Sequence, residues 1–119
     1  MIFAKVDFVE LNNVKLPVAF NMKALRLGAI ESGKSINEVF QLMQSGDLSA
    51  GADLIPYFFH ALAVGHEIQK KDLPFNREDM EMMDFEALGI FTEAFTRSVN
   101  KMDQTEKKQL KTVKKGVKN

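Results

Sequence analysis

The spacing of apolar residues changes at Asn21, and this change constrains the fold more than any other feature of the sequence. From Val14 to Phe20 every second residue is apolar, a period typical of a half-buried strand. From residue 22 to residue 29 apolar or small residues recur at i, i+3, i+6 and i+7, which is the spacing of one helix face. The sequence therefore predicts an α+β fold, with an N-terminal β-hairpin followed by a mainly α-helical bundle of about five helices.

The hairpin is expected over residues 2–20. Its first strand contains two alternating sets of residues, Ile2, Ala4, Val6 and Phe8 on one face and Phe3, Lys5, Asp7 and Val9 on the other. Leu11-Asn12-Asn13 predicts the turn, because asparagine tolerates left-handed backbone angles. Pro17 has no N–H to donate, so it predicts an edge strand or the unpaired side of one.

Two helices are expected between residues 21 and 46. Asn21 is a suitable N-cap for the first, and Gly33 can end it in a left-handed conformation. Ser35 and Glu38 predict a capping box, in which the Ser35 side chain accepts the Glu38 N–H and the Glu38 carboxylate reaches back. GKS at 33–35 predicts a junction between these helices rather than a phosphate loop, because Gly28 is expected inside a helix and not in a strand–loop frame.

Three further helices are expected after residue 48. The third extends from Ser49 to about Lys70, and its regular part begins near Asp53, because a proline in the interior would cost about 3 kcal/mol whereas Pro56 in the first turn does not. Asn76 caps a short helix over residues 77–83. Asp84 caps a longer helix, one face of which carries the apolar residues Leu88, Phe91, Phe95 and Val99.

Composition fits one folded domain with a modest core. The chain has 119 residues, 45% of them hydrophobic and 27% charged. It has no cysteine, so disulfides and thiolate metal sites are excluded. The start MIFAKVDFVE carries charges and does not resemble a signal peptide. No uncharged apolar run approaches the roughly 18–20 residues of a membrane span. We expect a cytoplasmic protein with no membrane partner.

The neutral net charge hides an asymmetry between two parts of the chain. Residues 1–100 hold 9 Lys/Arg and 14 Asp/Glu, a net charge of −5, whereas residues 101–119 hold 7 Lys and 2 acids, a net charge of +5. We expect a single domain over 1–100 followed by a basic, flexible C-terminal tail over 101–119. Two interpretations of the tail remain open: a solubilising end or a nucleic-acid contact.

No residue pattern predicts catalysis. His60 and His66 are six residues apart, about 120° apart around a helix, so they do not form the i, i+4 pair that binds a metal. We expect ordinary, partly exposed histidines. The acidic pairs within residues 78–84 fall in the first turns of predicted helices, where the dipole favours negative charge. We expect no catalytic residue, metal, cofactor or small-molecule substrate, and a protein that is not an enzyme.

Methionines and phenylalanines gather beside charges in EDMEMMDFE. Either some of them pack inward and the rest cover the edge of the core, or they form a surface for flexible apolar segments, for which the adaptable side chain of methionine is suited. The second interpretation gives six candidate partner-binding residues: Met80, Met82, Met83, Phe85, Phe91 and Phe95.

The order of these segments resembles a known family. The hairpin LNNVKLPVAF leads into NMKALRLGAIESGKS and INEVF, and DLIPYFFHALAVGHE, REDMEMMD and FEALGIFTEAF follow. Over about residues 10–100 this order is similar to the tail assembly chaperones of siphoviruses and prophages. The likeness rests on patterns of small, apolar and polar positions, and no site residue is carried over from it.

The resemblance implies a non-enzymatic role in virion morphogenesis. Such chaperones bind the tape measure protein, a long, largely helical and aggregation-prone ruler, and help deliver it to the tail tube protein. They act in the host bacterial cytoplasm and are typically absent from the mature virion. The predicted strand–helix–helix frame would then hold apolar helix faces ready for a helical client, and copies without a client are expected to form a homo-oligomer.

Two hypotheses concern the tail. Many members of the family have a longer version made by a programmed frameshift, and we hypothesise a −1 slip near Lys107-Lys108 or Lys114-Lys115. The competing function is a small nucleic-acid-associated phage regulatory protein that uses the basic tail. Nucleic-acid binding is the weaker expectation, because neither arginine nor aromatic residues interleave the lysines.

Overall fold

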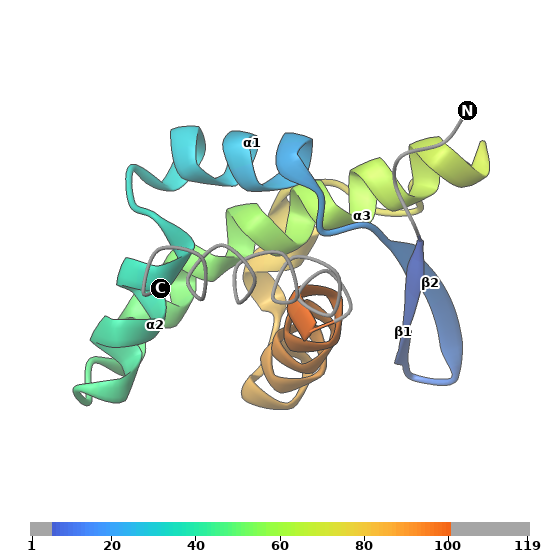
Figure 1. The fold of residues 1–119 in the computed structure, drawn as a ribbon. Helices are drawn as coiled ribbons and strands as arrows, with labels where there is room; N and C mark the ends of the chain where they lie inside the picture. The colour runs from blue at the N-terminus through green and yellow to red at the C-terminus, as the bar shows by residue number, and fades with distance from the viewer. Residues whose placement is uncertain (1–5, 101–119) are drawn as a thin grey trace, which may run out of the picture.

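The protein has an α+β fold: a two-stranded hairpin is followed by helices (Figure 1). The computed structural model describes residues 6–100. Among these residues, four α-helices and two 3-10 helices follow the hairpin. The elements are β1 (Asp7–Leu11), β2 (Val14–Val18), α1 (Met22–Ser32), α2 (Ile36–Gln44), η1 (Leu48–Leu54), α3 (Ile55–Gln69), η2 (Glu78–Met82) and a C-terminal helix over residues 85–100.

The hairpin is antiparallel and turns at Asn12 and Asn13, whose φ angles are 51° and 65°. These left-handed angles confirm the predicted turn. Of the expected first strand, residues 2–5 lie outside the described residues, and β1 begins at Asp7. Val9 is buried opposite Leu16. Pro17 faces Phe8, a position where the ladder of a two-residue hairpin requires no N–H donor.

Helix α3 is the centre of the molecule, with α1 along one side and the hairpin beside its C-terminal half (Figure 1). The chain approaches α3 closely at two glycines. A Cβ at Gly65 would lie 2.5 Å from the Pro17 carbonyl oxygen, and one at Gly28 would lie 2.9 Å from the Tyr57 Cα. The tight contacts therefore fix both β2 and α1 against α3.

The segment that contains α3 is strongly apolar, although Asp53 and Glu67 interrupt it. Leu48–Gln69, which joins η1 to α3, is long and apolar enough by length and composition to cross a membrane. In the structure, 61% of an apolar 18-residue stretch within this segment is buried inside the protein, as expected for a core helix. Pro56 lies in the first turn of α3, which confirms its predicted position.

The predicted helix caps are present. Asn21 accepts from the Ala24 N–H at 3.1 Å, and Gly33 ends α1 with φ 74°. Ser35 accepts from the Glu38 N–H at 3.1 Å, but among the described residues the reciprocal bond from Glu38 is not formed. The junction predicted at GKS is confirmed, since it lies between α1 and α2.

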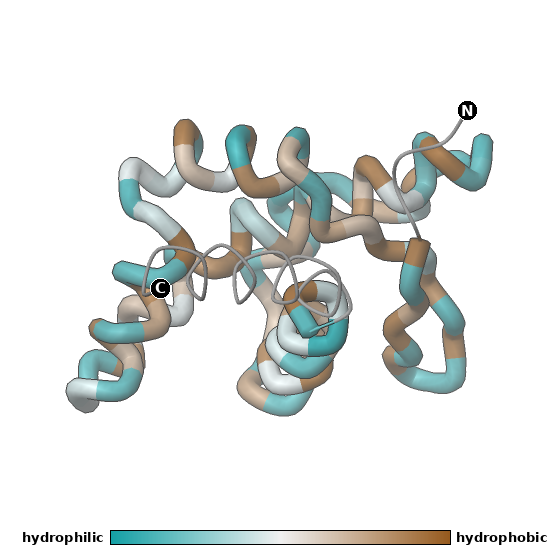
Figure 2. Tube along the Cα trace, in the orientation of Figure 1, coloured by the Kyte–Doolittle hydropathy of each residue, from teal (hydrophilic) through white to brown (hydrophobic). Residues whose placement is uncertain are grey.

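The C-terminal helix packs its aromatic face on the core. Phe91 stacks on Phe58 with ring centroids 5.2 Å apart, and Phe95 contacts Phe20 and Phe40 edge-on or tilted. In Figure 2 this helix, seen end-on, carries both hydrophobic and hydrophilic turns. The predicted tail over 101–119 and the two frameshift positions lie outside the described residues.

Candidate partner-binding surface

A short link, Met83-Asp84, joins η2 to the C-terminal helix, and one helix cap lies before it and another at its end. Before it, Asn76 and Asp79 form a reciprocal capping box: the Asp79 N–H donates to the Asn76 side chain at 3.0 Å, and the Asn76 N–H donates to the Asp79 carboxylate at 2.8 Å. At its end, Asp84 accepts from the Ala87 N–H at 2.9 Å. Between these caps, Glu78–Met82 form the 3-10 helix η2, which replaces the expected α-helix over 77–83.

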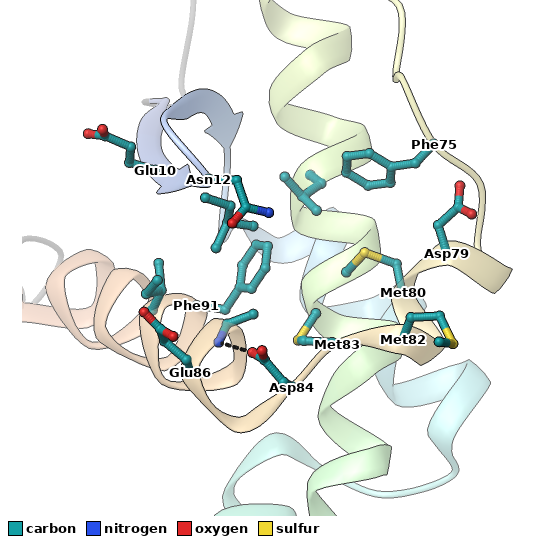
Figure 3. A pocket seen from close by; sticks show the side chains of 14 residues that line it. Glu10, Asn12, Phe75, Asp79, Met80, Met82, Met83, Asp84, Glu86 and Phe91 are labelled. Carbon is teal, nitrogen blue, oxygen red and sulfur yellow. Dashed lines mark hydrogen bonds between the residues drawn. The ribbon is translucent and has the colours of Figure 1, made fainter.

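Two apolar hollows lie on either side of this link. The first has a volume of about 380 Å³ and lies between the hairpin turn, α3, η2 and the C-terminal helix (Figure 3). The second, of about 280 Å³, lies between η1, the start of α3 and the link. Met83 and Asp84 line both hollows. Figure 3 shows Met83 and Phe91 directed into the first hollow, with Met82 at its outer edge.

The six candidate residues differ in how much of each side chain is exposed. Met82 and Phe85 are 86% and 70% exposed, so both side chains are accessible to a partner. Met83 is half-buried at the boundary of the hollows, and Met80, only 5% exposed, lines the first hollow from below. These four residues lie together, as the sequence predicts.

Phe91 and Phe95 correct the predicted surface. Phe91 is fully buried, because its ring stacks on Phe58, and only its edge closes the bottom of the first hollow. Phe95 is half-buried between Phe20 and Phe40, away from both hollows. Both residues therefore serve the core rather than a partner surface.

Leu48 is not among the residues predicted from the sequence, but it is 61% exposed and lines the second hollow together with Phe85. An apolar residue directly after the Gly46-Asp47 turn, outside any predicted helix, is the only signal that pointed to it. The sequence predicts only a turn at Leu11 and Asn12, yet both residues also line the first hollow. Folding thus brings three separate segments to one surface.

The charges around the hollows are all negative. Glu10, Asp79, Asp84 and Glu86 line the first hollow, and Glu81 and Asp84 line the second. No Lys or Arg is among the lining residues of either hollow in the described part of the chain. Residues 78–93 hold six Asp/Glu and no Lys or Arg. The surface therefore combines apolar side chains with an acidic rim.

Arg77, the cation nearest in sequence, is engaged elsewhere. Its guanidinium bonds to Glu31 of α1 at 2.7 Å and to Glu81 at 2.9 Å. Burial would lower the pKa of Arg77, but these two carboxylates raise it above its usual value. Arg77 therefore ties η2 to α1 without neutralising the rim.

Glu31 receives a second donor from α3. His60 Nε2 lies 3.1 Å from its carboxylate. Burial alone would raise the pKa of Glu31, but the hydrogen bonds and charges of Arg77 and His60 together hold the pKa below its usual value. This cluster holds η2, and with it Met80 and Met82, against α1 and α3.

The histidines do not lie together in a metal site. His60 is partly exposed as expected, but His66 is only 4% exposed, with Nδ1 2.7 Å from the Leu62 carbonyl oxygen. The expectation that both are partly exposed is therefore wrong for His66, which is a satisfied core residue. Within residues 6–100, no three His, Asp or Glu side chains could hold a metal ion.

Residues 28–35, GAIESGKS, match the letters of the phosphate-loop pattern GxxxxGK[ST]. Their geometry does not match it, because Gly28 to Ser32 are helical and Gly28 packs on Tyr57. The Lys34 ammonium pairs with Asp53 at 2.8 Å, and this bond raises its pKa. The Lys34 carbonyl accepts the Tyr57 hydroxyl. These contacts make GKS a structural junction.

Comparison with protein-family models, with curated proteins and with solved structures finds no match to this chain.

Proposed function

We propose that the protein is a non-enzymatic phage tail assembly chaperone, which binds the tape measure protein and helps recruit tail tube subunits during tail morphogenesis. One observation carries the binding role: Met82 and Phe85 are 86% and 70% exposed beside two apolar hollows. Exposed apolar side chains at the edge of a hollow are the usual anchor points for a helical segment. The resemblance in segment order supplies the kind of client.

Methionine at this position suits a chaperone. Its unbranched side chain can follow clients of varied shape, because each of its rotatable bonds can readjust. Met80 and Met83 line the hollow beneath the exposed Met82, so the floor of the site is adaptable as well as its edge.

The test is co-expression of the full chain with the tape measure protein from the same phage genome. We expect the chaperone to increase the soluble fraction of the client, and Phe85→Ser to abolish most of that gain. Met22→Ser is the matched control, because Met22 is 76% exposed but lies on α1, away from both hollows. Equal loss in both variants, or no gain with the unaltered chain, would contradict the proposal.

Salt dependence separates this function from nucleic-acid binding through the tail. Apolar client binding should persist at high salt, whereas phosphate contacts by the seven tail lysines would weaken steeply with salt. We also expect the chaperone to self-associate without its client, because copies can cover the exposed apolar residues of one another. Light scattering at high concentration tests this expectation, and a strict monomer would contradict it.

A further inference from the structure

We propose that residues 107–118 of the chain bind its own acid-rimmed hollows and compete there with other apolar segments. The proposal concerns what covers the surface in the free protein, so it goes beyond the proposed function. It rests on the sequence of this segment, on the charge of the rim and on the distance that the chain must span.

The segment has the sequence pattern of a basic amphipathic helix. Leu110, Val113 and Val117 are spaced i, i+3 and i+7, the spacing of one helix face. The remaining positions are mostly basic: Lys107, Lys108, Lys111, Lys114, Lys115 and Lys118. Three apolar residues are too few to form a core of their own, so this face can be buried only against another surface.

The hollows offer the complementary surface. Their floors are apolar, and all charged residues that line them are acidic. The net charge of +5 on residues 101–119 equals in magnitude the −5 on residues 1–100. When the apolar face of the segment enters the hollows, its apolar side chains are buried and its lysines are attracted to the acidic rim. This attraction also favours one orientation of the segment.

The connection is long enough. The C-terminal helix begins beside the hollows at Phe85 and extends about 23 Å to residue 100, at 1.5 Å per residue. The seven steps from residue 100 to Lys107 span up to about 25 Å when extended. The chain can therefore return along this helix and bring Leu110 to the hollows of the same molecule.

Site-specific cross-linking tests this directly, because the full chain has no cysteine. We would combine Thr112→Cys with Met82→Cys, treat the protein with a short bis-maleimide and separate the products on a denaturing gel. The matched control pairs Thr112→Cys with Met22→Cys, which is 76% exposed but lies on α1. Met82 and Met22 are both exposed, and Thr112 lies beyond the described residues. Equal denaturation midpoints would verify that the variants fold alike.

We expect the Met82 pair to cross-link within one molecule at least tenfold faster than the Met22 pair. Replacing the six lysines of the segment by glutamine should remove that advantage, as should Glu81→Gln combined with Glu86→Gln. Equal rates for the two pairs would overturn the proposal, and cross-linked dimers alone would assign the hollows to a second copy. No client is present, so a negative result leaves the solubility test of the proposed function unaffected.

Discussion

The surroundings of α3 and the link before the C-terminal helix differ in how closely they are packed. Around α3, the backbone of β2 lies so close to Gly65 that a single added methyl group would meet three backbone atoms within 2.7 Å. At the link, Met82 and Phe85 are 86% and 70% exposed. Large apolar side chains around α3 are buried and hold the fold, whereas Met82 and Phe85 are exposed on the surface.

Two aromatic residues of the C-terminal helix, Phe85 and Phe91, show the same difference in packing. Phe91 has no exposed surface and stacks on Phe58, while Phe85, six residues earlier at the first position of the helix, is 70% exposed. A substitution at one should therefore change stability, and at the other only binding.

Phe91→Ala should lower the free energy of unfolding by about 3–5 kcal/mol, because it leaves a cavity beside Phe58. Phe85→Ala is the control, and it should stay within about 0.5 kcal/mol because the side chain is mostly exposed. Urea denaturation measures both. Comparable losses at the two positions would show that the link is part of the core after all.

Gly65→Ala should cost about 3 kcal/mol, since overpacking forces β2 away from α3. The added Cβ would lie 2.5 Å from the Pro17 carbonyl oxygen, and backbone atoms cannot rotate aside. Gly89→Ala in the C-terminal helix is the matched control, because no neighbouring atom lies within 4 Å of its added Cβ. The control should gain roughly 0.5–1 kcal/mol from helix propensity. A stable Gly65→Ala protein would mean that β2 packs loosely.

Much of the fold could be predicted from local signals. The turn at Asn12-Asn13, the caps at Asn21, Gly33 and Asp84, and the position of Pro56 each depend on a few neighbouring residues. Local chemistry also misled in one case. A complete capping box was expected at Ser35, but the reciprocal pair is formed at Asn76 and Asp79.

The binding surface could be predicted only in part, because exposure depends on how distant segments pack. Methionines 80, 82 and 83 and Phe85 were found from their clustering. The sequence places Phe91 and Phe95 on the surface, but the helix face that they share with Leu88 meets the core through Phe58, Phe20 and Phe40. Leu48 joins the surface only through the fold, since it lies 37 positions before Phe85 in the chain.

Asn76→Ala should cost about 1 kcal/mol, within the usual range of 0.5–2 kcal/mol for loss of an N-cap. The Asn76 side chain satisfies the Asp79 N–H, and its loss would loosen η2 beneath the hollows. Ser35→Ala removes the cap of α2, should cost a similar amount, and lies away from both hollows. Only Asn76→Ala is therefore expected to weaken client binding as well. Equal binding by the two variants would separate η2 from the site.

The smallest expected change in the free energy of unfolding comes from the ion-pair cluster at Glu31, and it should depend on pH. The folded state lowers the pKa of Glu31 below its usual 4.5 because Arg77 and His60 bond to the ionised carboxylate. The stabilisation is therefore present above about pH 4.5 and is lost as the pH falls below that value. Pairs this exposed contribute below about 1 kcal/mol.

Glu31→Gln should consequently reduce the free energy of unfolding at neutral pH, and its difference from the unaltered protein should shrink as the pH falls below 4.5. Glu93→Gln is the control, because Glu93 is exposed and makes no ion pair with another described residue. Denaturation midpoints between pH 3 and pH 7 measure the difference. A difference that grows toward low pH would reverse the sign and show that the cluster does not hold η2 through an ionised Glu31.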